Sequence, residues 1–196
     1  MEFFKRDIRI VAYLLFIAVA QFIVFLNIAG FLAPNYSIHS NTISHLGVPA
    51  YTPYWWMFSA TIIILGLLLI LSGLMLKEYS FPLMIFLILS GIGSAGVGIV
   101  NENYIGTLHL IFALFAFLFS SLASYAILYR NKNLISAFWA FLGTIGLIAL
   151  ILFIGKIHLG LGEGGMERLI VIPNLIWALG FSMYLLGSAH NGKNSN

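Results

Sequence analysis

Six apolar runs, each about 20 residues long, dominate this sequence of 196 residues. Only 8% of the residues are charged, whereas soluble domains carry about 25%, so the chain has too few charged residues to form a water-exposed surface. At a rise of about 1.5 Å per residue, each run is long enough to cross the hydrocarbon core of a bilayer. The sequence therefore predicts an all-α polytopic integral membrane protein, in which residues 1–196 form one six-helix domain. The expected spans are about 8–31, 55–76, 81–100, 105–129, 134–155 and 169–187.

Short polar breaks separate these runs, and a glycine-rich turn over residues 160–165 precedes the last one. The charged N-terminal residues lead directly into the first apolar run. That run is too long for the core of a cleaved signal peptide, and no small-residue cleavage pattern follows it. We expect a retained first helix.

The distribution of Lys and Arg predicts the orientation, because cytoplasmic loops are enriched in these residues. Only Lys156 and Arg168 fall on one side, while the other seven lie on the side of the termini. We therefore expect a plasma-membrane protein with both termini cytoplasmic and with residues 32–54, 101–104 and 156–168 facing outward. Aromatic residues that suit the membrane interface mark the outward start of the second run, namely Tyr51, Tyr54, Trp55 and Trp56.

Small residues form a stripe in the third run, where Ser90, Ser94 and Gly98 repeat at intervals of four. Such a stripe occupies one face of a helix and lets a neighbouring helix approach closely in lipid. We interpret it as a packing surface in preference to the lining of a pore. Acidic residues are scarce at depth in the bilayer, which argues against a channel or a pump.

The first outward loop contains the densest group of polar side chains. Ser40 is a suitable cap for a short helix that would end at Gly47, and such a helix would place Asn41 and His45 on one face. One interpretation is a lid that presents Asn41, Ser44 and His45 to a cavity. The other is an ordinary solvated loop.

His109 lies about one turn inside the fourth run, where an ionisable side chain needs a partner or water. Small residues continue its helical face, so we expect it to point into the bundle. Its role can be structural or functional, and the sequence does not decide between these.

Glu167 and Arg168 open the sixth run, and Asn174 follows seven residues after Glu167 on the same helical face. One interpretation pairs Arg168 with Glu102 in a clamp across helices. The other makes Glu167 a base or metal ligand, with Arg168 holding an anionic group. His158 and Glu163 are expected to be solvated loop residues.

The chain has no cysteine, which excludes disulfides and thiolate chemistry. It also has no His-Glu-x-x-His pattern. We assign no metal site and no cofactor; His39, His45, His109 and Glu167 could supply ligands only by converging in the fold. Asn35 begins a glycosylation sequon whose use depends on the host. The small net charge of +3 does not indicate nucleic-acid binding.

Four short motifs occur together in this chain: residues 40–47, residues 98–102, Gly106 to His109, and Glu167 to Leu169 with Pro173 and Trp177. In these motifs the chain resembles the prokaryotic and archaeal membrane family catalogued as domain of unknown function 998. The resemblance implies six helices and no established activity, and the family commonly has an acidic residue at the position of His45.

Two hypotheses about function remain open. The first is a protein that binds a lipid or a partner, as an accessory subunit of a larger membrane complex or as a homo-oligomer. The second is an intramembrane hydrolase, with or without a metal ion, which acts on a lipid or a membrane-anchored substrate. It requires His45, His109 and Glu167 to converge as catalytic residues. The candidate ligand-binding residues are Asn41, Ser44, Glu102, Arg168 and Asn174.

Overall fold

A computed structural model describes residues 2–191 of the chain. Six of its helices are long and apolar enough to cross a membrane, which confirms the prediction of fold class. They are α1 (Glu2–Leu32), α2 (Trp55–Met75), α3 (Phe81–Ile99), α4 (Gly106–Asn131), α5 (Leu134–Ile154) and α6 (Gly162–Asn191), and a short 3₁₀ helix, η1 (Ser44–Gly47), precedes α2.

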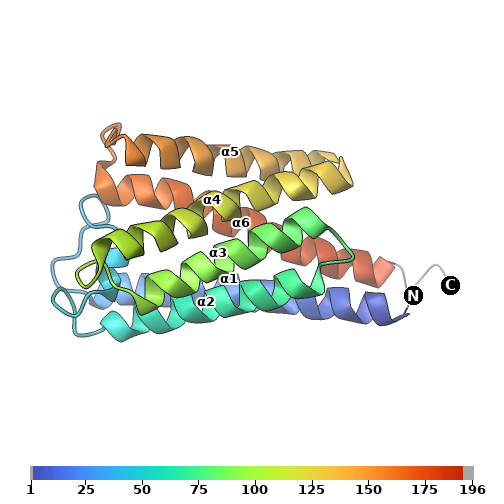
Figure 1. Cartoon of the computed structure of the whole chain (residues 1–196), viewed down its shortest axis with the longest axis horizontal. Helices are drawn as coiled ribbons and strands as arrows, with labels where there is room; N and C mark the ends of the chain where they lie inside the picture. Colours follow the sequence, from blue (N-terminus) through green and yellow to red (C-terminus); the bar gives the residue numbers. More distant parts are fainter. Residues whose placement is uncertain (1, 192–196) are drawn as a thin grey trace.

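Each helix packs against the next one in the chain, and α6 returns to pack against α1. Figure 1 shows that both ends of the described chain lie at one end of the bundle. The opposite end carries residues 33–54, 100–105 and 155–161, and we call it the loop end.

Large apolar side chains lie on the outside of the bundle as well as in its core. Phe31 is 90% exposed and Leu134 is 88% exposed, and every one of the six long helices carries further exposed aliphatic or aromatic residues. A surface of this kind suits hydrocarbon and not water, because extended apolar patches on soluble proteins are rare. The structure therefore fits a multi-pass membrane protein.

The glycines of α3 let it approach two neighbours closely. A Cβ atom added to Gly66 of α2 would lie 2.5 Å from the carbonyl oxygen of Gly91, so these two backbones touch. On another face, Gly93 leaves no room for a Cβ beside the α4 backbone at Ala116. Ser90 also donates to the carbonyl of Ala116, at 3.2 Å. The expected packing role of small residues in the third run is confirmed.

Two local predictions are wrong. The sixth span was expected to begin at residue 169 after a turn over 160–165, but α6 is helical from Gly162. Gly164 packs against the loop backbone at Ile38 and Asn41, and its N–H donates to the carbonyl of His39 at 3.0 Å. This tertiary contact outweighs the low helix propensity of glycine.

The helix expected from Ser40 to Gly47 is also shorter than predicted. Only the 3₁₀ turn Ser44–Gly47 forms, and it ends at the predicted glycine. Asn41 instead closes a turn of its own, because its Oδ1 accepts from the N–H of Ser37 at 2.8 Å. Asn41 and His45 therefore do not share a helical face.

Candidate functional site

Arg168 holds the first loop on the loop end of the bundle. Its Nη1 donates to the carbonyl oxygens of Ile38 and Asn41, both at 3.2 Å, and to that of Gly164 at 2.8 Å. Its Nη2 donates to the hydroxyl of Tyr36, and the guanidinium lies 5.5 Å from the centre of the Tyr36 ring. One cation thus joins α6 to three positions of the loop.

Tyr36 stays a neutral phenol in this arrangement. Burial raises the pKa of Tyr36 above its ordinary value of 10, and the nearby guanidinium of Arg168 opposes that rise. The protonated hydroxyl donates to the carbonyl of Thr42 at 3.0 Å while it accepts from Arg168. Tyr36 therefore links Arg168 of α6 to the backbone of Thr42, in the segment that leads into η1.

Glu102 does not form the expected clamp with Arg168. No ion pair joins these two residues in the described part of the chain; the carboxylate of Glu102 turns to η1 instead. Its Oε1 lies 2.9 Å from Nδ1 of His45, and its Oε2 accepts from the hydroxyl of Ser44 at 2.8 Å. The prediction was wrong because backbone carbonyls, which no sequence pattern reveals, take the donors of Arg168.

His45 is held on three sides. Besides Glu102, its Nδ1 lies 3.1 Å from the hydroxyl of Thr42, and its ring stacks on Tyr51 at a centroid distance of 4.3 Å. His45 lines a pocket of about 290 Å³ at the loop end, which Asn35, Tyr36, Asn41, Tyr51 and Thr52 also border. This orientation by a carboxylate is one that histidines with a free Nε2 use in binding and catalysis.

Glu167 and His109 have separate roles. Glu167 is 6% exposed, and its carboxylate accepts a hydrogen bond from the backbone N–H of Ile43. His109 is 4% exposed, as its predicted inward direction requires, and its Nδ1 lies 2.6 Å from the carbonyl oxygen of Val100, just after α3. Each residue satisfies a backbone group at a junction of elements.

The three candidate catalytic residues thus have three different partners: Glu102 for His45, Ile43 for Glu167 and Val100 for His109. Among the residues that the structure describes, no three His, Asp or Glu side chains are grouped as a metal ion would require. A hydrolase that uses these three side chains in one site has no support from this geometry.

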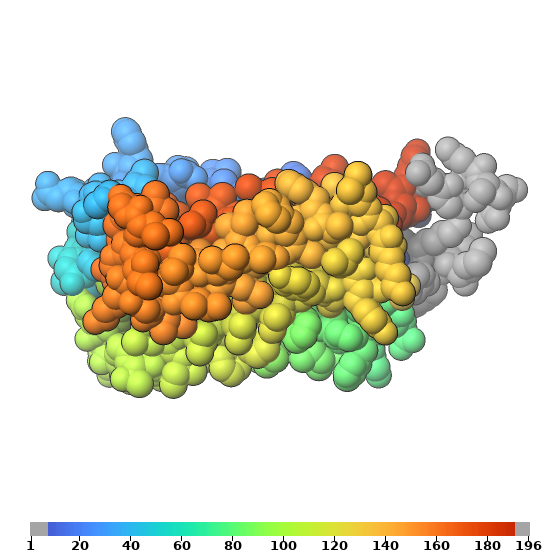
Figure 2. Space-filling view, turned by 90° about the horizontal axis from the view of Figure 1, so that it is seen from above, coloured from blue at the N-terminus to red at the C-terminus, as the bar shows by residue number. Residues whose placement is uncertain are grey.

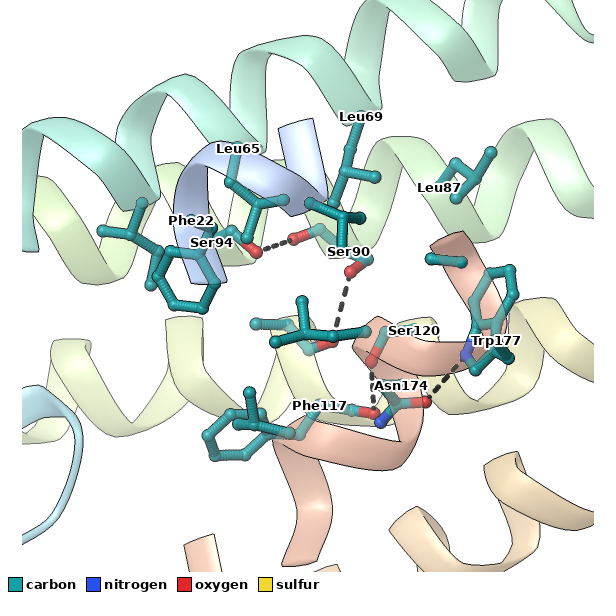
Figure 3. A pocket seen from close by; sticks show the side chains of 16 residues that line it. Phe22, Leu65, Leu69, Leu87, Ser90, Ser94, Phe117, Ser120, Asn174 and Trp177 are labelled. Atoms are coloured by element: carbon teal, nitrogen blue, oxygen red, sulfur yellow. Dashed lines mark hydrogen bonds between the residues drawn. The ribbon is translucent and has the colours of Figure 1, made fainter. Parts of the chain in front are cut away.

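Asn174 lies away from the loop end, in the middle of the bundle. Its Oδ1 accepts from the indole N–H of Trp177 at 3.0 Å, and its Nδ2 donates to the hydroxyl of Ser121 at 2.9 Å. Asn174 borders an internal cavity of about 80 Å³, whose walls come from α1, α2, α3, α4 and α6 (Figure 3). Most of that wall is apolar, with Ser90, Ser94 and Ser120 as its other polar residues.

A larger groove of about 560 Å³ runs between α4 and α5 and reaches the loop end. Figure 2 shows the face on which these two helices lie side by side. The groove has apolar walls and a polar mouth formed by Lys156, His158 and Glu163. We expected His158 and Glu163 to be solvated loop residues; the sequence offered no helical phase that would place them beside α4. The walls consist of Leu110, Ala113, Leu114, Phe117, Leu150, Phe153 and Ile154.

Comparison with protein families identifies the chain. Residues 16–184 match the family described as "Protein of unknown function (DUF998)". The chain belongs to the DUF998 family. Neither the curated proteins nor the solved structures yield a match. DUF998 membership agrees with the six-helix membrane bundle and assigns no activity, so an interpretation of function depends on the geometry above.

Proposed function

We propose that this DUF998 protein binds a membrane lipid, whose hydrocarbon chain lies in the groove between α4 and α5. The observation that carries the proposal is the groove itself, which combines apolar walls along two helices with charged residues at one end. Lipids have the same division into an apolar chain and a polar headgroup. The volume of the groove, about 560 Å³, lies within the usual range for small-molecule sites.

The groove is deep enough for the part of a lipid chain nearest the headgroup, about two thirds of the thickness of one leaflet. Its α4 wall extends from Leu110 to Phe117, which are seven residues apart and span about 10 Å along the helix axis. The polar mouth lies where α5 ends and α6 begins, at the loop end and therefore near one membrane surface. A lipid in this groove keeps its headgroup at the interface and its chain in the hydrocarbon layer.

Phe117 gives the groove a connection to the bundle interior. Its side chain lines both the groove and the internal cavity of about 80 Å³ (Figure 3). Phe117 is therefore the residue at which the groove and the cavity adjoin.

A matched pair of tryptophan substitutions tests the proposal. Leu114→Trp fills the groove from a position that is 39% exposed, whereas Ile64→Trp adds the same bulk to a 45% exposed position on α2. We expect native mass spectrometry of the purified protein to show co-purified lipid on the wild type and on Ile64→Trp, and little on Leu114→Trp. Equal lipid on both variants would overturn the proposal.

A hydrolase is the second candidate function, and the pairing of His45 with Glu102 favours it. With Nδ1 held by the carboxylate, Nε2 remains as a base that could activate a water for attack on a lipid ester. This candidate predicts that the wild type, but not His45→Ala, releases fatty acid from phospholipid vesicles. Equal rates for the two proteins would exclude His45 as that base.

A further inference from the structure

The mouth of the α4–α5 groove carries both signs of charge, and this feature indicates the class of its ligand. We propose that it recognises a phospholipid headgroup that has both a phosphate and a primary ammonium group. Lys156 and His158 would contact the phosphate, and Glu163 would accept hydrogen bonds from the ammonium. The inference rests on the proposed lipid-binding function and names the lipid class.

The three polar residues of the mouth are available to a ligand. Lys156 and Glu163 are exposed and His158 is half-buried, yet all three line the same groove. Over residues 2–191, no ion pair involves any of them, although opposite charges are present at one site. In a chain with only 8% charged residues, a cation and an anion beside one apolar groove form a complementary site for a dipolar headgroup.

Backbone hydrogen bonds fix the turn between α5 and α6, which carries Lys156 and His158. Three hydrogen bonds close the turn: Lys156 N–H to the Phe153 carbonyl at 3.0 Å, Ile157 N–H to Leu152 at 2.9 Å, and Leu161 N–H to His158 at 2.8 Å. Lys156 also has a positive φ of 56°, which few residues adopt without local support. The backbone of the mouth is thus formed before a ligand arrives, so only the side chains have to be ordered on binding.

The chemistry of Glu163 distinguishes a primary ammonium from the alternatives. A quaternary ammonium has no N–H to donate to a carboxylate, and its known sites are cages of aromatic rings. A phosphoglycerol headgroup has no cation to place beside Glu163. Phosphocholine loses the hydrogen bonds to Glu163, and phosphoglycerol loses the charge pair as well. At an exposed site each loss is worth up to about 1 kcal/mol, so we expect a preference of about 3- to 5-fold for the lipid with the primary ammonium.

Lipid competition on the purified full-length protein tests the inference. The probes are three phospholipids with identical acyl chains and phosphoethanolamine, phosphocholine or phosphoglycerol headgroups. For the wild type we expect phosphoethanolamine to bind about 3- to 5-fold more tightly than the other two. Glu163→Gln should abolish this preference, and Lys156→Gln should weaken all three lipids. Lys77→Gln should leave binding and preference unchanged, because Lys77 lies between α2 and α3, at the end of the bundle opposite the loop end.

The outcomes separate the headgroup from the groove. If the wild type binds all three lipids equally, or if Glu163→Gln keeps the preference, the headgroup assignment is overturned. The lipid-binding proposal still stands in that case, provided that Leu114→Trp abolishes binding. If Leu114→Trp binds lipid as the wild type does, the groove is not the site and both proposals fall.

Discussion

Replacement of Arg168 by alanine should detach the first loop from the bundle without unfolding the helices. The side chain makes four hydrogen bonds, three of them to the loop and one to Gly164 within α6. After the substitution, the carbonyl of Asn41 and the hydroxyl of Tyr36 lose a charged donor in a half-buried position. The carbonyl of Ile38 is more exposed and regains a partner from water.

The expected cost follows from that inventory. A hydrogen bond typically contributes about 1 kcal/mol net, and bonds to a charged group contribute somewhat more. Two or three bonds that water does not replace therefore predict a loss of about 2–4 kcal/mol for Arg168→Ala. Arg168→Lys should recover less than half of this lost stability. A guanidinium carries donors on separate nitrogens, whereas the single ammonium of lysine cannot contact acceptors that lie as far apart.

Thermal unfolding in detergent, together with hydrogen exchange of residues 36–45, measures the effect. We expect faster exchange in that segment for Arg168→Ala and unchanged exchange in α2 and α3. Lys77→Ala is the control, because Lys77 is an exposed cation in the connection between α2 and α3, at the other end of the bundle. A melting temperature and exchange pattern equal to those of the wild type would show that the Arg168 bonds add nothing to the loop's stability, and would refute the reasoning.

Three further predictions concern packing, the interior and the orientation. Gly164→Ala should destabilise the protein by about 1–3 kcal/mol, since the added Cβ would lie 2.5 Å from the carbonyl oxygen of Ile38. Gly187→Ala is its control in the same thermal melts: Gly187 has open space around it, so this change should be neutral or stabilising by up to about 1 kcal/mol. Asn174→Leu should cost about 1–2 kcal/mol by leaving the buried indole N–H of Trp177 without an acceptor, and a melting temperature equal to that of the wild type would contradict this. The chain has no cysteine, so single-cysteine variants report topology: an impermeant maleimide added to whole cells should label Asn103→Cys and not Glu78→Cys, and the reverse pattern would invert the predicted orientation.

Helix number and approximate position could be predicted because both are local properties of the sequence. A run of apolar residues needs a hydrocarbon environment and satisfies its own backbone hydrogen bonds wherever it packs. Four of the six predicted spans, the second to the fifth, accordingly begin and end within two residues of α2, α3, α4 and α5. The start of α6 could not be predicted, because the glycines at its beginning are held by a loop segment more than 120 residues earlier in the chain.

The polar side chains show a similar limit. Sequence reasoning selected Ser44, His45 and Glu102 as candidate site residues, but it paired Glu102 with Arg168; the structure joins Glu102 to Ser44 and His45 instead. This reasoning assigned the wrong partner to Arg168, because backbone carbonyls of a folded loop leave no trace in residue identity. The chemistry of a residue type indicates which side chains are candidates for a site, whereas the partner of each one requires the fold.

This difference also bears on where a ligand would bind. Glu167 and Arg168 were functional candidates in the sequence, but in the structure they form hydrogen bonds with the first loop. Removing either side chain would therefore affect the fold first. Glu163, which was expected to be a solvated loop residue, lies with Lys156 beside an apolar groove, and neither forms an ion pair within residues 2–191. A buried charge that is already satisfied gains little from a ligand, whereas an unpaired charge at a groove gains a partner. We therefore expect substitutions at Lys156 and Glu163 to change lipid binding at constant stability, and substitutions at Arg168 to do the reverse.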